Sequence, residues 1–154
     1  MKKLIKVTMA VAALLVMFAC SDKIETPKYL DVTPNNISGS WRLESSCGAP
    51  LAEGAYVYVD FDRKDRTFEM YQNTDSFSTR YITGRYYIYV DGNAGSVIRG
   101  DYDFGNGAWA HRYIVTNLTE NRMVWTALDD SKYVDVYVRC DIPAAILTAG
   151  ADEE

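Results

Sequence analysis

The chain has 154 residues, with 16 Lys and Arg against 21 Asp and Glu, and a formal net charge of −5. This acidic balance argues against nucleic acid as a partner, because phosphate binding needs clustered basic side chains. The length is that of one domain, and a hydrophobic content of 48% is enough for a buried core.

The first residues have the pattern of an export signal. Lys2 and Lys3 precede an apolar run over 7–18, which is shorter than the roughly 20 residues that span a bilayer but suits a signal-peptide core. The run ends in Ala19-Cys20, which resembles a bacterial lipobox, where the cysteine is acylated after cleavage. We therefore expect a signal peptide over 1–19 and a lipid on Cys20. An ordinary secretory signal is the alternative.

The segment over 20–36 is polar and contains Pro27 and Pro34, which indicates a flexible tether behind the lipidated cysteine. The folded domain is expected to begin at residue 37. The stretch 39–44 then alternates apolar Trp41 with charged neighbours, as the opening strand of a sheet does when one face is buried.

Seven further strand signals follow at regular spacing, with turn residues such as Asp91-Gly92 between them. A lone Gly84 inside one of them indicates a bend or bulge. Eight short strands joined in sequence predict an all-β fold, an eight-stranded antiparallel up-and-down barrel over 37–142, since closure removes exposed edges. A β-sandwich is the alternative. The seven later strands are expected at 56–61, 67–71, 79–90, 97–102, 111–119, 122–128 and 132–140.

The end of the chain is expected to be an acidic tail over 143–154, with only a hint of helix at 143–147. Apart from the lipidated Cys20, the exported chain has two cysteines, Cys47 and Cys140, and this even number favours a disulfide. They lie near the ends of the first and last strands, which barrel closure brings side by side. No CxxC pair or histidine cluster supports a redox or metal role for them.

Two short motifs resemble those of a known family. Gly39-Ser40-Trp41 resembles the G-x-W that opens the first strand of lipocalins and the wider calycin group. Arg139 stands where that group places a basic residue across the tryptophan. The resemblance implies structural roles for Gly39, Trp41 and Arg139.

The runs 84–86, 113–118 and 137–139 also resemble lipocalin-like domains of small Gram-negative lipoproteins, and the similarity covers 37–141. The family has a helix after the last strand, where this chain has few residues to form one. The resemblance carries over no ligand-binding residue.

Tyrosines recur in alternating sets, so that the members of a set share one face of their strand. If these faces point into the barrel, they form an aromatic and polar cavity for an apolar or amphipathic ligand. If a strand is shifted by one residue, its inward and outward faces are exchanged. On the last strand Val134, Val136 and Val138 would then point inward, and the tyrosines would form an outer surface for a protein partner. Trp109 follows a glycine-rich loop and is a candidate for the barrel mouth. The candidate ligand-binding residues are Tyr87, Tyr89, Arg99, Tyr113, Trp125 and Tyr137.

No catalytic or metal-binding constellation is evident. His111 is the only histidine and belongs to no motif with ligand or triad spacing. We expect no enzymatic activity, no cofactor and no metal. The sequence predicts an outer-membrane lipoprotein, on the periplasmic or cell-surface face, that contacts the membrane only through its lipid and binds a small apolar or amphipathic ligand. Docking to another envelope protein is the alternative.

Overall fold

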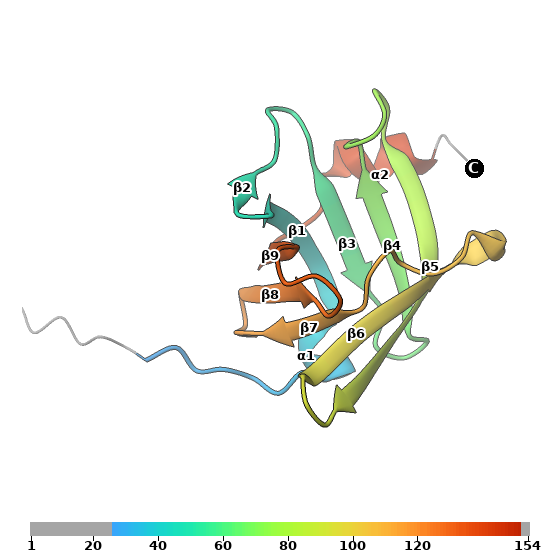
Figure 1. Ribbon diagram of the computed structural model, residues 1–154. Helices are drawn as coiled ribbons and strands as arrows, with labels where there is room; N and C mark the ends of the chain where they lie inside the picture. Colours follow the sequence, from blue (N-terminus) through green and yellow to red (C-terminus); the bar gives the residue numbers. More distant parts are fainter. Residues whose placement is uncertain (1–25, 152–154) are drawn as a thin grey trace, which may run out of the picture.

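The computed structural model describes residues 26–151. Within them one antiparallel sheet curls round on itself, with a short helix before it and a longer one after it (Figure 1). The elements are α1 (Pro34–Ile37), β1 (Gly39–Ser46), β2 (Ala49–Pro50), β3 (Val57–Phe61), β4 (Thr67–Gln72), β5 (Arg80–Asp91), β6 (Gly95–Tyr102), the 3₁₀ helix η1 (Asp103–Gly105), β7 (Tyr113–Thr116), β8 (Arg122–Ala127), β9 (Val134–Arg139) and α2 (Ala144–Ala151).

The sheet is a closed barrel. Neighbouring strands follow one another in sequence from β3 to β9, and β1 pairs with both β3 and β9. Trp41 stands opposite Arg139 and Ser46 opposite Asp135 along the closing pair. The two-residue β2 only extends the end of β1. The predicted eight-stranded up-and-down barrel is therefore confirmed, and the sandwich alternative is excluded.

The register of the closing pair corrects the predicted disulfide. Because β1 and β9 are antiparallel, the end of one lies beside the start of the other. The amide of Cys47 donates to Val134 O at 2.8 Å, whereas the amide of Cys140 donates to Ser40 O at 3.2 Å. At about 3.3 Å per residue, roughly 20 Å of strand separates the two cysteines, and a disulfide needs Cα atoms within about 7 Å. Both thiols are free.

Alternate residues of each strand fill the barrel, as the period of two requires. On β3, for example, Val57, Val59 and Phe61 are buried while the residues between them are partly exposed. The predicted bulge at Gly84 is absent, because the β4–β5 ladder runs through it without a register shift and the β5–β6 ladder ends at it in a regular pair with Tyr102. Glycine is required there for packing: a Cβ would lie 2.7 Å from the Phe68 ring and 2.2 Å from Asp101 O. The largest fully buried side chains are Trp41, Tyr86, Phe61, Phe68, Ile37, Ile98, Leu118 and Met123.

One end of the barrel is sealed by α1. The indole Nε1 of Trp41 donates to Ile37 O at 2.7 Å, and the Arg139 guanidinium lies 4.0 Å from the centre of the Trp41 ring. Arg139 ties the surrounding backbone together by donating three hydrogen bonds, to the carbonyl oxygens of Asn36, Ser38 and Glu120. We call this end, with α1, Trp41 and Arg139, the closed end.

The chain before the barrel is partly packed. The amide of Leu30 donates to Leu118 O at 2.8 Å, and Leu30 and Val32 lie against the core. Part of the expected tether over 20–36 is therefore part of the domain. The signal peptide over 1–19 and the lipidation of Cys20 lie outside the described residues.

The segment expected to be a tail forms the eight-residue helix α2 on the outside of β4 and β5 (Figure 1). Gly150 lets the helix approach β4 closely, since a Cβ there would lie 2.7 Å from the Tyr71 ring. Short helices depend mainly on tertiary packing of this kind, which a local pattern does not reveal. No helix within 26–151 combines the length and apolar character needed to cross a membrane.

Candidate functional site

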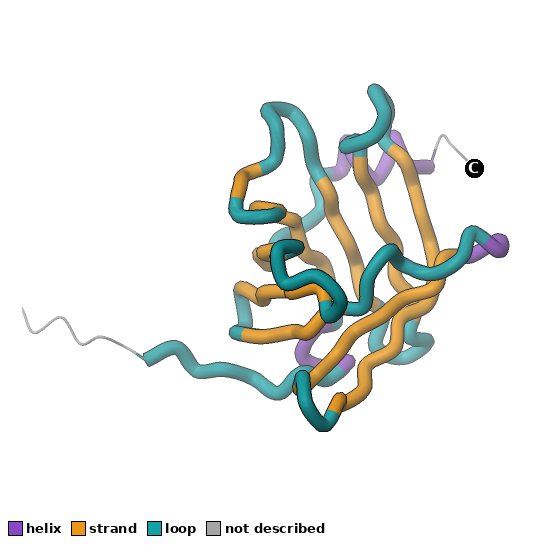
Figure 2. The backbone as a smooth tube through the Cα atoms, in the orientation of Figure 1, coloured by secondary structure: helices purple, strands orange, loops and turns teal. Residues whose placement is uncertain are grey.

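The candidate site lies at the end of the barrel opposite α1, where long loops follow β2, β4 and β6 (Figures 1 and 2). β5 is longer than its partner here. Gly84 pairs with Tyr102, the last residue of β6, so residues 80–83 pair only with β4. The loop after β6 does not continue that ladder, and an open hollow remains beside the start of β5.

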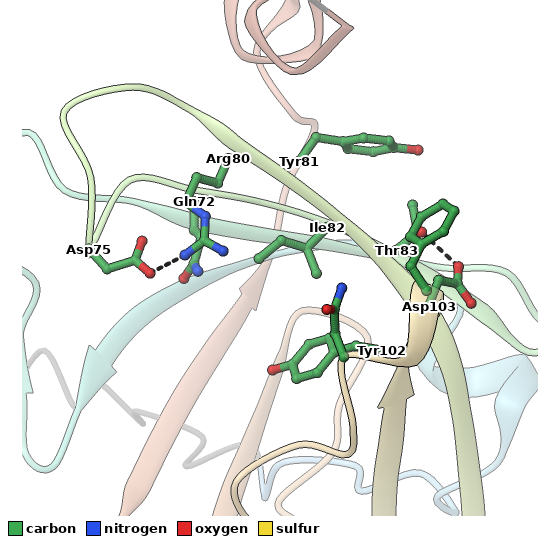
Figure 3. Close-up of a pocket in the computed structure, with 10 residues that line it drawn as sticks. Gln72, Asp75, Arg80, Tyr81, Ile82, Thr83, Tyr102 and Asp103 are labelled. Atoms are coloured by element: carbon green, nitrogen blue, oxygen red, sulfur yellow. Dashed lines mark hydrogen bonds and ion pairs between the residues drawn. The ribbon is translucent and has the colours of Figure 1, made fainter. Parts of the chain in front are cut away.

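We call this hollow the mouth depression. Its volume is about 880 Å³, within the range of pockets that hold small molecules. Figure 3 shows Ile82 and Tyr102 near its middle, while Tyr81 points away from them. The residues that line the mouth depression are Gln72, Asp75, Arg80, Tyr81, Ile82, Thr83, Tyr102, Asp103, Phe104 and Asn106.

Polar pairs stand on two sides of the apolar centre (Figure 3). Arg80 forms an ion pair with Asp75 from the loop that precedes β5. On the other side, the Thr83 hydroxyl donates to Asp103 Oδ2 at 2.7 Å. A ligand in the mouth depression therefore meets apolar surface at the middle and charged or hydrogen-bonding groups at the edges.

Phe104 is an apolar side chain held out at the rim. It is 94% exposed and lines the mouth depression from η1. Its backbone is left-handed, with φ 60° and ψ 25°, a conformation uncommon for residues other than glycine. Phe77, on the loop between β4 and β5, is also fully exposed. Two exposed phenylalanines on loops at this end provide apolar area that a ligand can cover.

A second, smaller hollow is lined by side chains on the inner face of the barrel, and we call it the inner cavity. Its volume is about 110 Å³, and it shares Tyr102 with the mouth depression. Most of its wall is aromatic, whereas the edges of the mouth depression are polar. The lining residues are Val59, Met70, Tyr102, Trp109, Ala110, Tyr113, Trp125 and Tyr137.

Trp109 reaches this wall from the loop between β6 and β7. Its amide donates to Gly100 O at 2.9 Å, and its ring lies so close to Gly100 that a Cβ there would be 2.2 Å away. The ring stacks on Trp125, with centroids 5.6 Å apart. The indole Nε1 is buried and has no hydrogen-bond acceptor in the part of the chain that the structure describes.

The structure divides the six predicted ligand-binding residues into two groups. Tyr113, Trp125 and Tyr137 point inward and line the inner cavity. The other three, Tyr87, Tyr89 and Arg99, are on the outer face.

For these outer residues the prediction of an inward position is wrong. Tyr87 is 41% exposed, and the Arg99 guanidinium lies 4.6 Å from the centre of its ring. The inward residue of this run of tyrosines is the buried Tyr86. Aromatic residues on both faces of β5 give no apolar–polar alternation that tells inside from outside.

An acidic group that the sequence did not single out lies beside the inner cavity. Asp135 stands opposite Trp125 in the ladder and on the same face of β9 as Tyr137. The Ser46 hydroxyl donates to Asp135 Oδ1 at 2.6 Å. Burial raises the pKa of the Asp135 carboxyl. Burial also raises the pKa of Tyr113 to about 12, and the charge of Asp135 adds to that shift.

At the rim, His111 Nδ1 lies 2.8 Å from Asp129 Oδ1, a pair accessible to solvent. Across residues 26–151 no group of three or more His, Cys, Asp or Glu side chains is placed to hold a metal ion.

The closed barrel with its Trp41–Arg139 seal and one open end is that of a lipocalin-like protein. A family model described as a lipocalin-like domain matches residues 37–125, and the chain belongs to this family, as the resemblance implied. The barrel continues past the match through β9. No curated protein and no solved structure matches the chain. A barrel of this family suggests the binding of small ligands.

Proposed function

We propose that the protein is a lipid-anchored envelope lipoprotein that binds a small amphipathic ligand at the open end of its barrel. The observation that carries this proposal is that Tyr102 lines both hollows, the aromatic inner cavity and the larger mouth depression. An apolar part of the ligand would enter the aromatic inner cavity, and a polar part would stay among the charged side chains of the mouth depression. The inner cavity alone is smaller than the roughly 300–1,000 Å³ of typical ligand pockets.

Binding can be tested with the uncharged fluorescent probe N-phenyl-1-naphthylamine and the full mature protein. The variant Ile82→Glu places a charge at the centre of the mouth depression. Val90→Glu is the matched control, because Val90 is on the same strand, is 79% exposed and does not line the mouth depression. We expect saturable binding that Ile82→Glu weakens about tenfold or more and Val90→Glu leaves unchanged. Absence of saturable binding, or equal effects of the two variants, would contradict the proposal.

The lipid anchor is supported by the apolar run that ends at Cys20. Residues 30–37 run across the closed end, so an anchored chain would enter the domain there, with the mouth at the opposite end. The mass of the mature protein extracted from membranes should exceed that of its polypeptide by attached acyl chains. Cys20→Ala should remove that excess, and a wild-type mass without it would refute acylation. Protease treatment of whole cells would distinguish a periplasmic from a surface position.

The outer face of β5 and β6 favours a second candidate function, docking to another envelope protein. Arg99 covers Tyr87 there, and Arg112 donates to the Tyr89 hydroxyl at 3.4 Å. Aromatic and arginine side chains are enriched where proteins bind one another. A photocrosslinking residue at Tyr87 should then trap one dominant partner, while the same residue at exposed Glu53 should not. Scattered products at both positions would argue against docking.

A further inference from the structure

Five aromatic side chains form most of the wall of the inner cavity: Tyr102, Trp109, Tyr113, Trp125 and Tyr137. Trp125 is central to the cluster, with its ring centroid 5.4 Å from Tyr113 and 4.7 Å from Tyr137. The ring planes of Trp109 and Tyr113 differ by 61°, so the rings face in different directions. The faces of such rings attract cations within about 6 Å, and clusters of them recognise substituted ammonium groups.

A carboxylate lies next to these rings. Asp135 is on the inward face, directly across from Trp125, and its hydrogen-bond partner is the neutral Ser46. Within residues 26–151 no Lys or Arg forms an ion pair with Asp135, and the one basic group that acts on its pKa, His111, is paired with Asp129 instead. A partly buried carboxylate without a counter-charge is unfavourable. A cation in the adjacent cavity would supply the missing charge.

The size of the inner cavity limits what enters. Its 110 Å³ corresponds to the space of about three or four water molecules in the liquid. That is enough for a compact head group but not for a whole ligand. The much larger mouth depression shares Tyr102 with the inner cavity and can take the remainder.

We propose that the inner cavity binds the cationic head group of an organic amine or quaternary ammonium compound, held by the aromatic rings and by the Asp135 carboxylate. This inference rests on the proposed function and names its ligand class. The aromatic rings would contact the substituents on the nitrogen, and Asp135 would offset its charge. The rest of the ligand would lie in the mouth depression.

The test compares choline with 3,3-dimethyl-1-butanol, an uncharged molecule of nearly the same shape with carbon in place of nitrogen. Binding to the full mature protein is followed by titration of the tryptophan indole N–H signals in NMR spectra. We expect choline to bind about tenfold or more tightly than the alcohol. Equal affinities, or tighter binding of the alcohol, would overturn the assignment to cations.

Two variants identify the groups responsible. Asp135→Asn keeps the size of the side chain and an acceptor for Ser46, and should weaken choline binding about tenfold while leaving the alcohol unchanged. Asp129→Asn, at the exposed rim, is the matched control and should change neither. An equal loss with both variants would show a general effect of charge and contradict a role for Asp135. Tyr113→Leu should weaken choline more than the alcohol, because it removes an aromatic ring but keeps apolar bulk.

The uncharged probe N-phenyl-1-naphthylamine separates failure of this inference from failure of the proposed function. If the probe binds in the mouth and choline neither binds nor competes, the cation assignment is wrong while the binding function stands. If neither compound binds, both are wrong.

Discussion

The ring of Trp109 lies directly on Gly100, so closely that a methyl group at Gly100 would come within 2.2 Å of it. The loop between β6 and β7 crosses the mouth at this contact, and the ring forms part of the inner cavity. The arrangement of the site therefore depends on a glycine that has no functional group of its own.

We predict that Gly100→Ala displaces Trp109 from the interior. Forcing a methyl group into a packed contact typically costs about 1–3 kcal/mol of unfolding free energy. The indole should become more exposed, with a red shift of tryptophan emission. Gly92→Ala is the control, since a Cβ there meets nothing within 4 Å, and its stability should stay within about 0.5 kcal/mol of wild type. Equal stability of the two variants in denaturant titrations would contradict the packing described.

A second prediction concerns the closed end. Arg139→Lys should lower the unfolding free energy by about 2 kcal/mol, because lysine cannot both cover Trp41 and reach all three carbonyl oxygens. Arg99→Lys is the control, since Arg99 also covers an aromatic ring but does so on the exposed outer face. It should cost less than about 1 kcal/mol. If denaturation curves give both variants the same loss of unfolding free energy, Arg139 does not hold the closed end.

The pH dependence of stability should reveal Asp135. Burial raises its pKa in the folded state above the ordinary value of 3.8, so the folded protein binds this proton more tightly than the unfolded chain does. The stability of wild type relative to Asp135→Asn should be greatest below about pH 3.8 and should fall as the pH rises through the folded pKa. Unfolding titrations of both proteins between about pH 3 and pH 7 measure the difference.

Asp129 should give a pH dependence of stability with the opposite sign in the same experiment. Hydrogen bonds from its own backbone amide and from His111 lower its pKa. The extra stability that Asp129 gives wild type over Asp129→Asn should therefore be complete above about pH 3.8. It should be lost as the pH drops through the lower pKa of the folded state. The same trend for both variants would mean that Asp135 is not buried as described.

The free cysteines provide a fourth prediction. In a Cys20→Ala background, a thiol reagent should label two groups per native molecule without prior reduction. Cys47 is exposed and should react first; Cys140 is less exposed, and burial raises the pKa of its thiol, so it should react more slowly. Reduction should leave the mass and the thermal midpoint unchanged. An unreactive protein that gains two thiols on reduction would contradict the β1–β9 register.

Much of the barrel could be predicted because its strands are short, alternate in polarity and are separated by turn residues. The same local signals place Cys47 and Cys140 near the ends of their strands, but they do not show which strand ends lie together in the barrel. Both are near strand ends, but antiparallel pairing places those ends far apart. The helix α2 was underestimated because it is stabilised by contact with Tyr71, which is distant in sequence.

The site was only partly predictable. Met123, Trp125 and Ala127 alternate with more exposed residues on β8 and are all buried, so the inward position of Trp125 followed from the pattern. The tyrosines of β5 occupy both faces, and their pattern left the choice open. Asp135 lies between two valines, where a lone acid normally indicates an outward position. The contact of Trp109 with Gly100 depends on a loop crossing, for which no periodicity exists.

The most direct test of ligand binding at the mouth uses the three tryptophans of the chain as reporters. Trp109 and Trp125 line the inner cavity, whereas Trp41 is buried at the closed end. In NMR titrations with N-phenyl-1-naphthylamine, the indole N–H signals of Trp109 and Trp125 should shift saturably while that of Trp41 stays in place. No shift at Trp109 and Trp125, or an equal shift of all three signals, would contradict binding at the open end of the barrel.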